Sequence, residues 1–178
     1  MNKYITNAIL IFLAVLFQLN FINFLPPTLK FINPLLIIII IIMITQDLKQ
    51  SLIWCLVVGF FIDLYSFLNF GTYIFTYILT IIITYYLFQK FITNKTLYTF
   101  LVLTFFSSLI FYTLLAFSSL FVQYFGFSSY SLNVSKNYLI FILIQGVSNS
   151  LIVVLIYMII NFLTQRLKAN FIFKDAKK

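Results

Sequence analysis

The stretch Gly59-Phe60-Phe61-Ile62-Asp63 decides the fold, together with Gly71, which lies eight residues after Asp63. Asp63 lies inside an apolar run, whereas the other two acidic residues lie next to lysines in polar surroundings. A carboxylate within a membrane-length segment costs a few kcal/mol or more, so it is rarely present by chance. Gly59 and Asp63 are four residues apart and share one face of a helix. Asn69-Phe70-Gly71 is typical of a tight turn. The stretch therefore predicts a membrane helix with one acid toward its far end, then a hairpin and the next helix.

Lipid is the expected solvent of this chain. Of its 178 residues, 63% are hydrophobic and only 8% are charged. A soluble domain of this size cannot bury that much apolar surface, so the composition predicts an all-α membrane protein. The eleven basic residues are scattered at the ends of the apolar runs, where topology charges occur. The net charge of +8 therefore does not indicate a nucleic-acid partner.

The residue types present argue against catalysis. The sequence contains no histidine and no glutamate, which removes the usual metal ligands and most general acid–base groups. Its single cysteine, Cys55, can form no intrachain disulfide. We therefore expect no enzymatic activity, no cofactor and no metal site.

Six membrane spans are expected, all in one helical bundle. They cover about residues 4–24, 31–46, 51–68, 72–91, 96–125 and 137–163, and a basic tail follows at residues 164–178. Asn33-Pro34 predicts an N-cap followed by proline at the first helical position of the second span. The aliphatic run of this span, Leu35 to Thr45, covers only about 20 Å, less than the ~30 Å hydrocarbon core. We therefore expect a helix that is tilted little, with either the Phe31-Ile32 approach to this span buried or the bilayer thinned around it.

The basic residues support this count of spans. With six spans, nine of the eleven basic residues lie on one side of the membrane, and only Lys30 and Lys136 lie on the other. Cytoplasmic loops carry the excess of lysine and arginine. Both termini are therefore expected in the cytoplasm.

Two interpretations of Asp63 follow from its depth, which is roughly 18 Å from the cytoplasmic start of its helix. In the first, the carboxylate lies near the outer headgroups and is satisfied by water, by Lys30 or by Lys136. In the second, Asp63 is a buried structural anchor that fixes its helix against a neighbour.

Polar residues on two other spans are candidates for interhelical contacts. Gln145 and Asn149 are four residues apart on the last span, and Gln145 is expected near the depth of Asp63. We hypothesise that Asp63 or its helical turn hydrogen-bonds to this face, and the alternative is ordinary packing between helices. A row of threonines at a spacing of four predicts a packing seam whose hydroxyl groups bond to their own helix. The row consists of Thr72, Thr76, Thr80 and Thr84.

The run Gly59-Phe60-Phe61-Ile62-Asp63-Leu64, with Gly71 after it, resembles the signature of the rod-shape-determining MreD family. That family has a glycine–x–x–x–aspartate–leucine run and a second glycine eight positions after the aspartate, in the hairpin between the third and fourth spans. Asn33-Pro34-Leu35-Leu36 is similar to the proline-led start of the family's second span, and the length, six-span layout and basic tail agree. The chain departs from the family pattern before Gly59, where it lacks an additional glycine, and in the turn, which reads Ser66-Phe67-Leu68-Asn69.

The resemblance implies a non-enzymatic component of the bacterial inner membrane that belongs to the cell-elongation machinery and controls cell shape. Its implied partner is MreC, a bitopic periplasmic coiled-coil protein, through which the complex influences the peptidoglycan polymerase and transpeptidase. The candidate structural or partner-contact residues are Pro34, Gly59, Asp63, Gly71, Gln145 and Asn149.

An alternative comes from the substrate-binding S components of energy-coupling-factor vitamin transporters. These are also six-helix proteins of this size, and the MreD family is similar to them in fold. Many carry small residues on the first span that dock their transport partner, whereas Ala8 and Ala14 here are six residues apart and do not stack on one face. A tightly bound vitamin, or a neighbouring gene for an ATPase, would favour this alternative.

Overall fold

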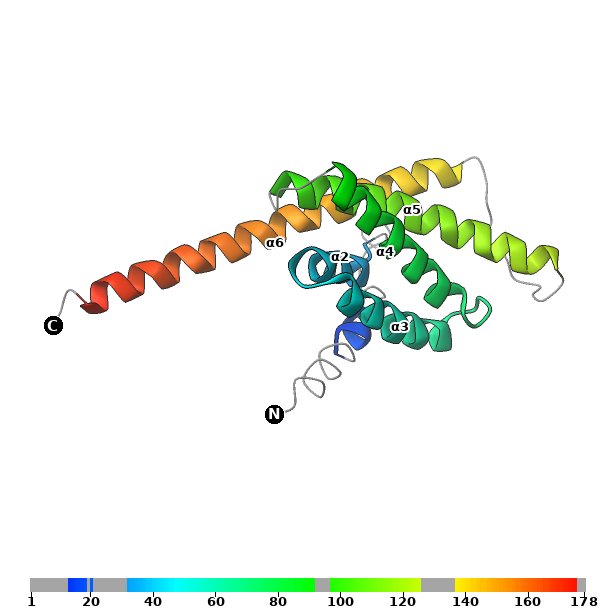
Figure 1. The fold of residues 1–178 in the computed structure, drawn as a ribbon, viewed down its shortest axis with the longest axis horizontal. Helices are drawn as coiled ribbons and strands as arrows, with labels where there is room; N and C mark the ends of the chain where they lie inside the picture. The colour runs from blue at the N-terminus through cyan, green and yellow to red at the C-terminus, as the bar shows by residue number, and fades with distance from the viewer. Residues whose placement is uncertain (1–12, 19, 21–31, 92–96, 126–136, 176–178) are drawn as a thin grey trace.

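The computed structural model describes residues 13–18, 20, 32–91, 97–125 and 137–175, and this part of the chain is all-helical, as expected (Figure 1). A helix covers residues 13–18. The five elements that follow are α2 (Pro34–Thr45), α3 (Leu48–Tyr65), α4 (Thr72–Phe91), α5 (Leu97–Tyr124) and α6 (Asn137–Asp175). Four of them contain stretches long and apolar enough to cross a membrane, which are Leu48–Tyr65, Thr72–Lys90, Leu97–Tyr124 and Tyr138–Met158.

The helix bounds agree with the expected spans except in three places. The expected first span, residues 4–24, lies mostly outside the described residues. Helix α3 begins and ends three residues before the expected range of 51–68, because the backbone is extended at Asp47 and again at Ser66. Helix α6 continues to Asp175, so the prediction that the helix ends at residue 163 is wrong. No glycine or proline occurs between residues 164 and 175 to stop it, and Figure 1 shows α6 running far beyond the other helices.

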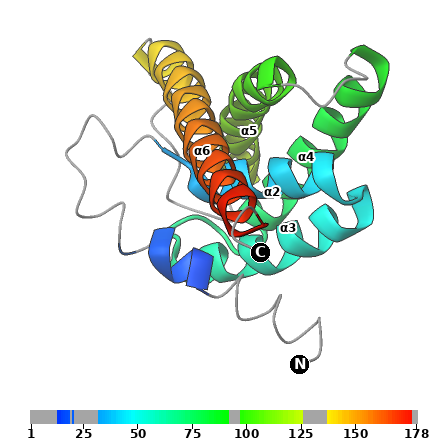
Figure 2. The ribbon, with the colours of Figure 1, turned by 90° about the vertical axis from the view of Figure 1, so that its left-hand side faces the viewer.

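Helix α2 lies at the centre of the bundle (Figure 2) and packs against α3, α4, α5 and α6. Eight of its 12 residues are buried, as expected for a helix that is hydrophobic all round. It is about 18 Å long, well short of the ~30 Å hydrocarbon core. In the approach to this helix, Ile32 is half-buried and Phe31 lies outside the described residues, so the burial of this approach stays a prediction.

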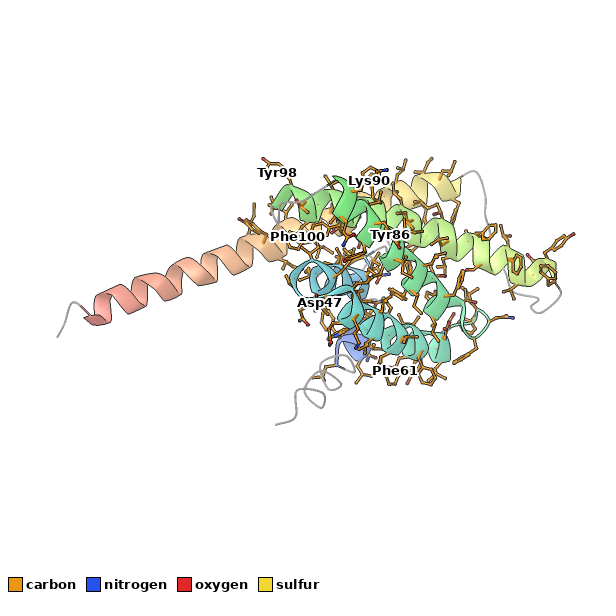
Figure 3. All side chains as sticks on the ribbon, viewed as in Figure 1. Asp47, Phe61, Tyr86, Lys90, Tyr98 and Phe100 are labelled. Atoms are coloured by element: carbon orange, nitrogen blue, oxygen red, sulfur yellow. The ribbon has the colours of Figure 1, made fainter. Side chains whose placement is uncertain are left out.

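The outer surface of the bundle is apolar and its interior is partly polar. Large hydrophobic side chains are exposed along α3, α4, α5 and α6, and Figure 3 shows Tyr98 projecting outward from α5. Serine, threonine, asparagine and glutamine side chains are buried between the same helices. This distribution is the reverse of the one in soluble proteins, where polar residues are mostly exposed. It fits a chain whose surroundings are lipid, in which polar groups must find partners inside the protein.

The threonine row on α4 forms the predicted packing seam. All four threonines are buried, and each hydroxyl group donates to a carbonyl group three or four residues earlier in the chain. The last of them, Thr84, also lies 2.8 Å from the Ser107 hydroxyl group on α5. Because these side chains are short, α4 and α5 can approach each other closely.

Candidate functional site

The carboxyl group of Asp63, on α3, holds the beginning of α4. Its Oδ1 atom accepts a hydrogen bond from the backbone N–H of Tyr73 at 2.9 Å. Its Oδ2 atom accepts from the N–H groups of Gly71 at 3.0 Å and Ile74 at 3.2 Å. The first N–H groups of a helix have no partner within the helix, and they favour negative charge. Asp63 therefore caps α4 from the neighbouring helix.

The fourth N–H group at this helix start is also satisfied. The N–H of Thr72 donates to the carbonyl oxygen of Asn69 at 3.1 Å, and the regular helical bonds begin with Phe75, whose N–H donates to the carbonyl oxygen of Gly71 at 2.9 Å. Every backbone donor in the first turn of α4 therefore has a partner. In a low-dielectric environment this matters, because an unpaired buried N–H is costly.

Gly59 allows the close approach that places Asp63 at this helix start. A Cβ atom built on Gly59 would lie 2.6 Å from Cα of Ile74 and 2.9 Å from its backbone nitrogen. Such distances are shorter than any side chain tolerates, so only glycine fits between α3 and α4 at this level. Since Asp63 lies one helical turn after Gly59, both residues act on the same part of α4.

Gly71 supplies the turn between the two helices. Its φ angle is +94°, in the region that favours glycine, and a Cβ atom there would meet nothing within 4 Å. The backbone conformation alone therefore selects glycine. Gly59, Asp63 and Gly71 act together at one place, which we call the α3–α4 junction.

The structure decides between the two interpretations of Asp63. The side chain is only 4% exposed and is held by α4, so it is a buried anchor against a neighbouring helix. The hypothesis that Asp63 or its helical turn hydrogen-bonds to the face of Gln145 and Asn149 is wrong for the carboxyl group of Asp63. Both carboxyl oxygens are occupied by α4 backbone groups, which lie nearer because the hairpin brings the start of α4 directly to Asp63. Lys30 and Lys136 lie outside the described residues.

The beginning of α2 is capped as the sequence predicted. Pro34 occupies the first turn, and the Asn33 side chain accepts from the N–H of Leu36 at 3.1 Å. The N–H of Leu35, one residue earlier, donates to Oε1 of Gln18 at 3.1 Å. A helix start inside the bundle is tolerated because its free N–H groups are satisfied by side chains.

Asn33 also joins α2 to three other helices. Its Oδ1 atom accepts from the Tyr77 hydroxyl group on α4 at 3.2 Å. Its backbone N–H donates to Oδ1 of Asn149 on α6 at 2.9 Å, and Nδ2 of Asn149 donates to the Ser108 hydroxyl group on α5 at 2.9 Å. Asn33, Asn149 and Ser108 are all buried. This network fixes α2, α4, α5 and α6 relative to one another.

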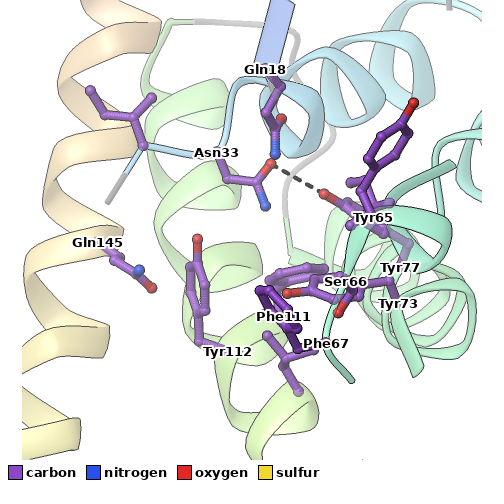
Figure 4. Close-up of a pocket in the computed structure, with 13 residues that line it drawn as sticks. Gln18, Asn33, Tyr65, Ser66, Phe67, Tyr73, Tyr77, Phe111, Tyr112 and Gln145 are labelled. Carbon is purple, nitrogen blue, oxygen red and sulfur yellow. Dashed lines mark hydrogen bonds between the residues drawn. The ribbon is translucent and has the colours of Figure 1, made fainter. Parts of the chain in front are cut away.

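A pocket of about 490 Å³ adjoins the start of α2, and we call it the α2 pocket. It is lined by Gln18, Ile32, Asn33, Ile62, Tyr65, Ser66, Phe67, Tyr73, Tyr77, Phe111, Tyr112, Leu115 and Gln145. Figure 4 shows Gln145 pointing from α6 toward Tyr112, with Asn33 and Gln18 above them. The Gln145 side chain is 3% exposed, and its Oε1 atom is buried with no hydrogen-bond partner among the described residues.

The six candidate residues thus fall into three groups. Gly59, Asp63 and Gly71 meet at the α3–α4 junction, Pro34 and Asn149 lie at the start of α2, and Gln145 lines the α2 pocket. Sequence reasoning missed several members of the second and third groups, because their sequence positions carry no pattern. These residues are Gln18, Tyr77, Ser108 and Tyr112.

Within the described ranges, no group of three or more histidine, cysteine, aspartate or glutamate side chains is placed to hold a metal ion. The chemistry available at the junction and at the start of α2 is hydrogen bonding to backbone groups. Searches against protein-family models, curated proteins and solved structures found no match for this chain.

Proposed function

We propose that this chain is a multi-pass scaffold of the bacterial cell-elongation machinery, of the MreD type, that works by binding rather than by catalysis. In this proposal the described helices and the segment before α2 form six spans in the cytoplasmic membrane, with both termini in the cytoplasm. Its direct partner is an MreC-like bitopic protein, through which it acts on the peptidoglycan polymerase and transpeptidase.

The α3–α4 junction is the observation that carries this proposal. The three residues that resemble the MreD signature have distinct and complementary roles there. Gly59 permits the close approach, Asp63 caps α4, and Gly71 makes the turn. The signature spacing therefore has one physical explanation, which is a hairpin held in a single geometry. A rigid hairpin supports a binding function because a surface that is already ordered loses little entropy when a partner binds.

The hairpin presents an apolar surface that suits a membrane helix. Phe60 on α3 and Phe70 in the turn are 45% and 62% exposed, and their rings meet edge to face with centroids 5.7 Å apart. Aromatic residues dominate the energetics of many interfaces. We therefore place the contact with the bitopic partner on this pair of rings.

Co-purification with the MreC-like protein of the same organism tests the proposal. Phe60→Ala and Phe70→Ala together are expected to reduce capture of the partner by about tenfold or more, as for interface anchors. Phe106→Ala, which truncates a similarly exposed ring on α5, is the control and should leave capture unchanged. A wild-type chain that captures an ATPase and no MreC-like protein would contradict the scaffold and favour the vitamin-transporter alternative.

A further inference from the structure

We propose that the α2 pocket is a binding site for a small uncharged ring compound that donates an N–H or O–H hydrogen bond to Gln145. The proposed scaffold function requires no ligand, whereas a vitamin as the bound compound would favour the transporter alternative, so the two functions are tested by capture of the partner and not by this site. Three features support this site: the space that α2 leaves, the unpartnered oxygen of Gln145 and the chemistry of the lining residues.

The short length of α2 creates the space. The helix is about 12 Å shorter than the hydrocarbon core, and Ile32 and Asn33 at its start line the pocket. The longer helices α3, α4, α5 and α6 surround α2 and continue past its start, so their side chains form the pocket wall. At about 490 Å³ the pocket lies within the usual range for small-molecule sites.

Gln145 indicates that something must donate a hydrogen bond inside this space. The residue is 3% exposed, and its Oε1 atom has no donor within reach among the described residues. An amide oxygen that is buried without a partner bears the full cost of its lost hydration. Nearly all buried polar groups in folded proteins have a partner. A donor group on a bound molecule would supply the missing hydrogen bond to Oε1 of Gln145.

The lining residues define the class of ligand. Tyrosine and phenylalanine rings make up much of the wall, including Tyr73, Tyr112 and Phe111, and amide groups come from Asn33 and Gln145. Aromatic walls favour a ring compound, and a few placed polar groups fix its orientation. None of the described residues that line the pocket carries a charge. A charged ligand would therefore lose its hydration without an opposite charge to compensate.

The test uses the full chain in nanodiscs of phosphatidylethanolamine and phosphatidylglycerol. Extraction and mass spectrometry should find an uncharged ring compound at near-stoichiometric amounts in the wild type. Gln145→Met keeps the size of the side chain but removes the acceptor, so the compound should fall by about tenfold. Gln89→Met makes the same change at an exposed position and should retain the compound. Compared with ligand-stripped wild type, Gln145→Met should have an equal or higher melting temperature, because the variant no longer buries an unpaired oxygen.

A matched pair of probes tests the donor requirement directly. Theobromine has one N–H group, which a methyl group replaces in caffeine, and both are uncharged at neutral pH. Ligand-stripped wild type should bind theobromine more tightly than caffeine, by about tenfold, and Gln145→Met should show no preference. The site is overturned if the wild type retains no compound and shows no preference between the probes, since water then fills the pocket. A charged compound that co-purifies with the wild type also overturns the site. Equal loss of the compound in Gln145→Met and Gln89→Met overturns it as well. Capture of the MreC-like partner, measured on the same samples, reports separately on the scaffold function.

Discussion

The backbone of Ile74, in the first turn of α4, lies directly against Gly59 of α3. A Cβ atom on Gly59 would come within 2.6 Å of Cα of Ile74. The N–H of the same Ile74 donates to Oδ2 of Asp63 at 3.2 Å. One residue of α4 is therefore held by two residues of α3 that are one helical turn apart. The hydrogen bond requires the close approach, because a wider separation would move the N–H away from the carboxyl group.

Gly59→Ala is expected to destabilise the protein by about 2–3 kcal/mol, since overpacking against backbone cannot be relieved by moving a side chain. The clash outweighs the gain of about 1 kcal/mol that alanine brings to a helix interior. The shift in the unfolding midpoint during titration with denaturing detergent measures the change.

Gly146→Ala is the matched control for this substitution. There a Cβ atom would meet the ring of Phe105 at 3.0 Å, and a ring can move where a backbone cannot. We expect a change within about 1 kcal/mol of zero, because the helix propensity of alanine offsets the adjustment. Equal destabilisation by the two variants would show that close backbone contact is not the reason for Gly59.

Asp63→Asn should lower the free energy of unfolding by about 1.5–3 kcal/mol, the range for hydrogen bonds to charged groups. Asparagine keeps the shape of the side chain, but its NH₂ group replaces one of the two acceptor oxygens. That NH₂ group would then face a backbone N–H donor. Asp47→Asn is the control, because Asp47 is exposed and its side chain makes no capping hydrogen bond with α3. This control should change stability by less than about 0.5 kcal/mol. Equal effects of the two variants in the same detergent titration would contradict the capping role.

The combination of Gly59→Ala and Asp63→Asn should cost less than the sum of the two single changes. Once the alanine has moved α4 away, the hydrogen bond from Ile74 is already weakened, so the second substitution has less to remove. Residues that share a partner show interaction energies of about 0.5–3 kcal/mol. A double-mutant cycle on the unfolding free energies measures this coupling. Strict additivity would show that the two residues act on α4 separately.

The sequence predicted the parts of the junction that depend on local periodicity. The spacing of Gly59 and Asp63 put both on one helix face, and Asn69-Phe70-Gly71 indicated the turn. The partner of Asp63 was not predictable in the same way. Sequence reasoning sought a polar side chain on another span, whereas the donors are backbone N–H groups, which every residue except proline carries. Only the geometry of the hairpin selects Gly71, Tyr73 and Ile74 as those donors.

The α2 pocket lay beyond what sequence patterns indicate. The uniform aliphatic run from Leu35 to Thr45 predicted a span too short for the membrane, and Asn33-Pro34 predicted its cap. The pocket requires in addition the relative placement of side chains from five further segments, including Gln18, Tyr112 and Gln145. Such a placement arises from packing between helices distant in sequence, which no single periodicity records.

Gly71→Ala should destabilise the protein by about 1–2 kcal/mol, the cost of a positive φ angle for a residue with a Cβ atom. Nothing lies within 4 Å of the added atom, so crowding contributes nothing to this cost. Gly71→Asn should cost less than Gly71→Ala, because asparagine adopts positive φ angles more readily. The same unfolding titration measures both variants. An asparagine variant less stable than the alanine variant would contradict the conformational explanation.

Asn149→Leu tests the network at the start of α2. The substitution keeps a similar volume but removes the oxygen that accepts from the N–H of Asn33. That buried N–H would then have no partner, at a cost of about 1–3 kcal/mol. Ser150→Ala is the control on the next position of α6. Its hydroxyl group donates to carbonyl groups that also belong to regular helices, so its loss should cost less than about 1 kcal/mol. Unfolding titrations that rank Ser150→Ala as the more damaging change would show that α2 is held mainly by apolar packing and that the asparagine pair contributes little.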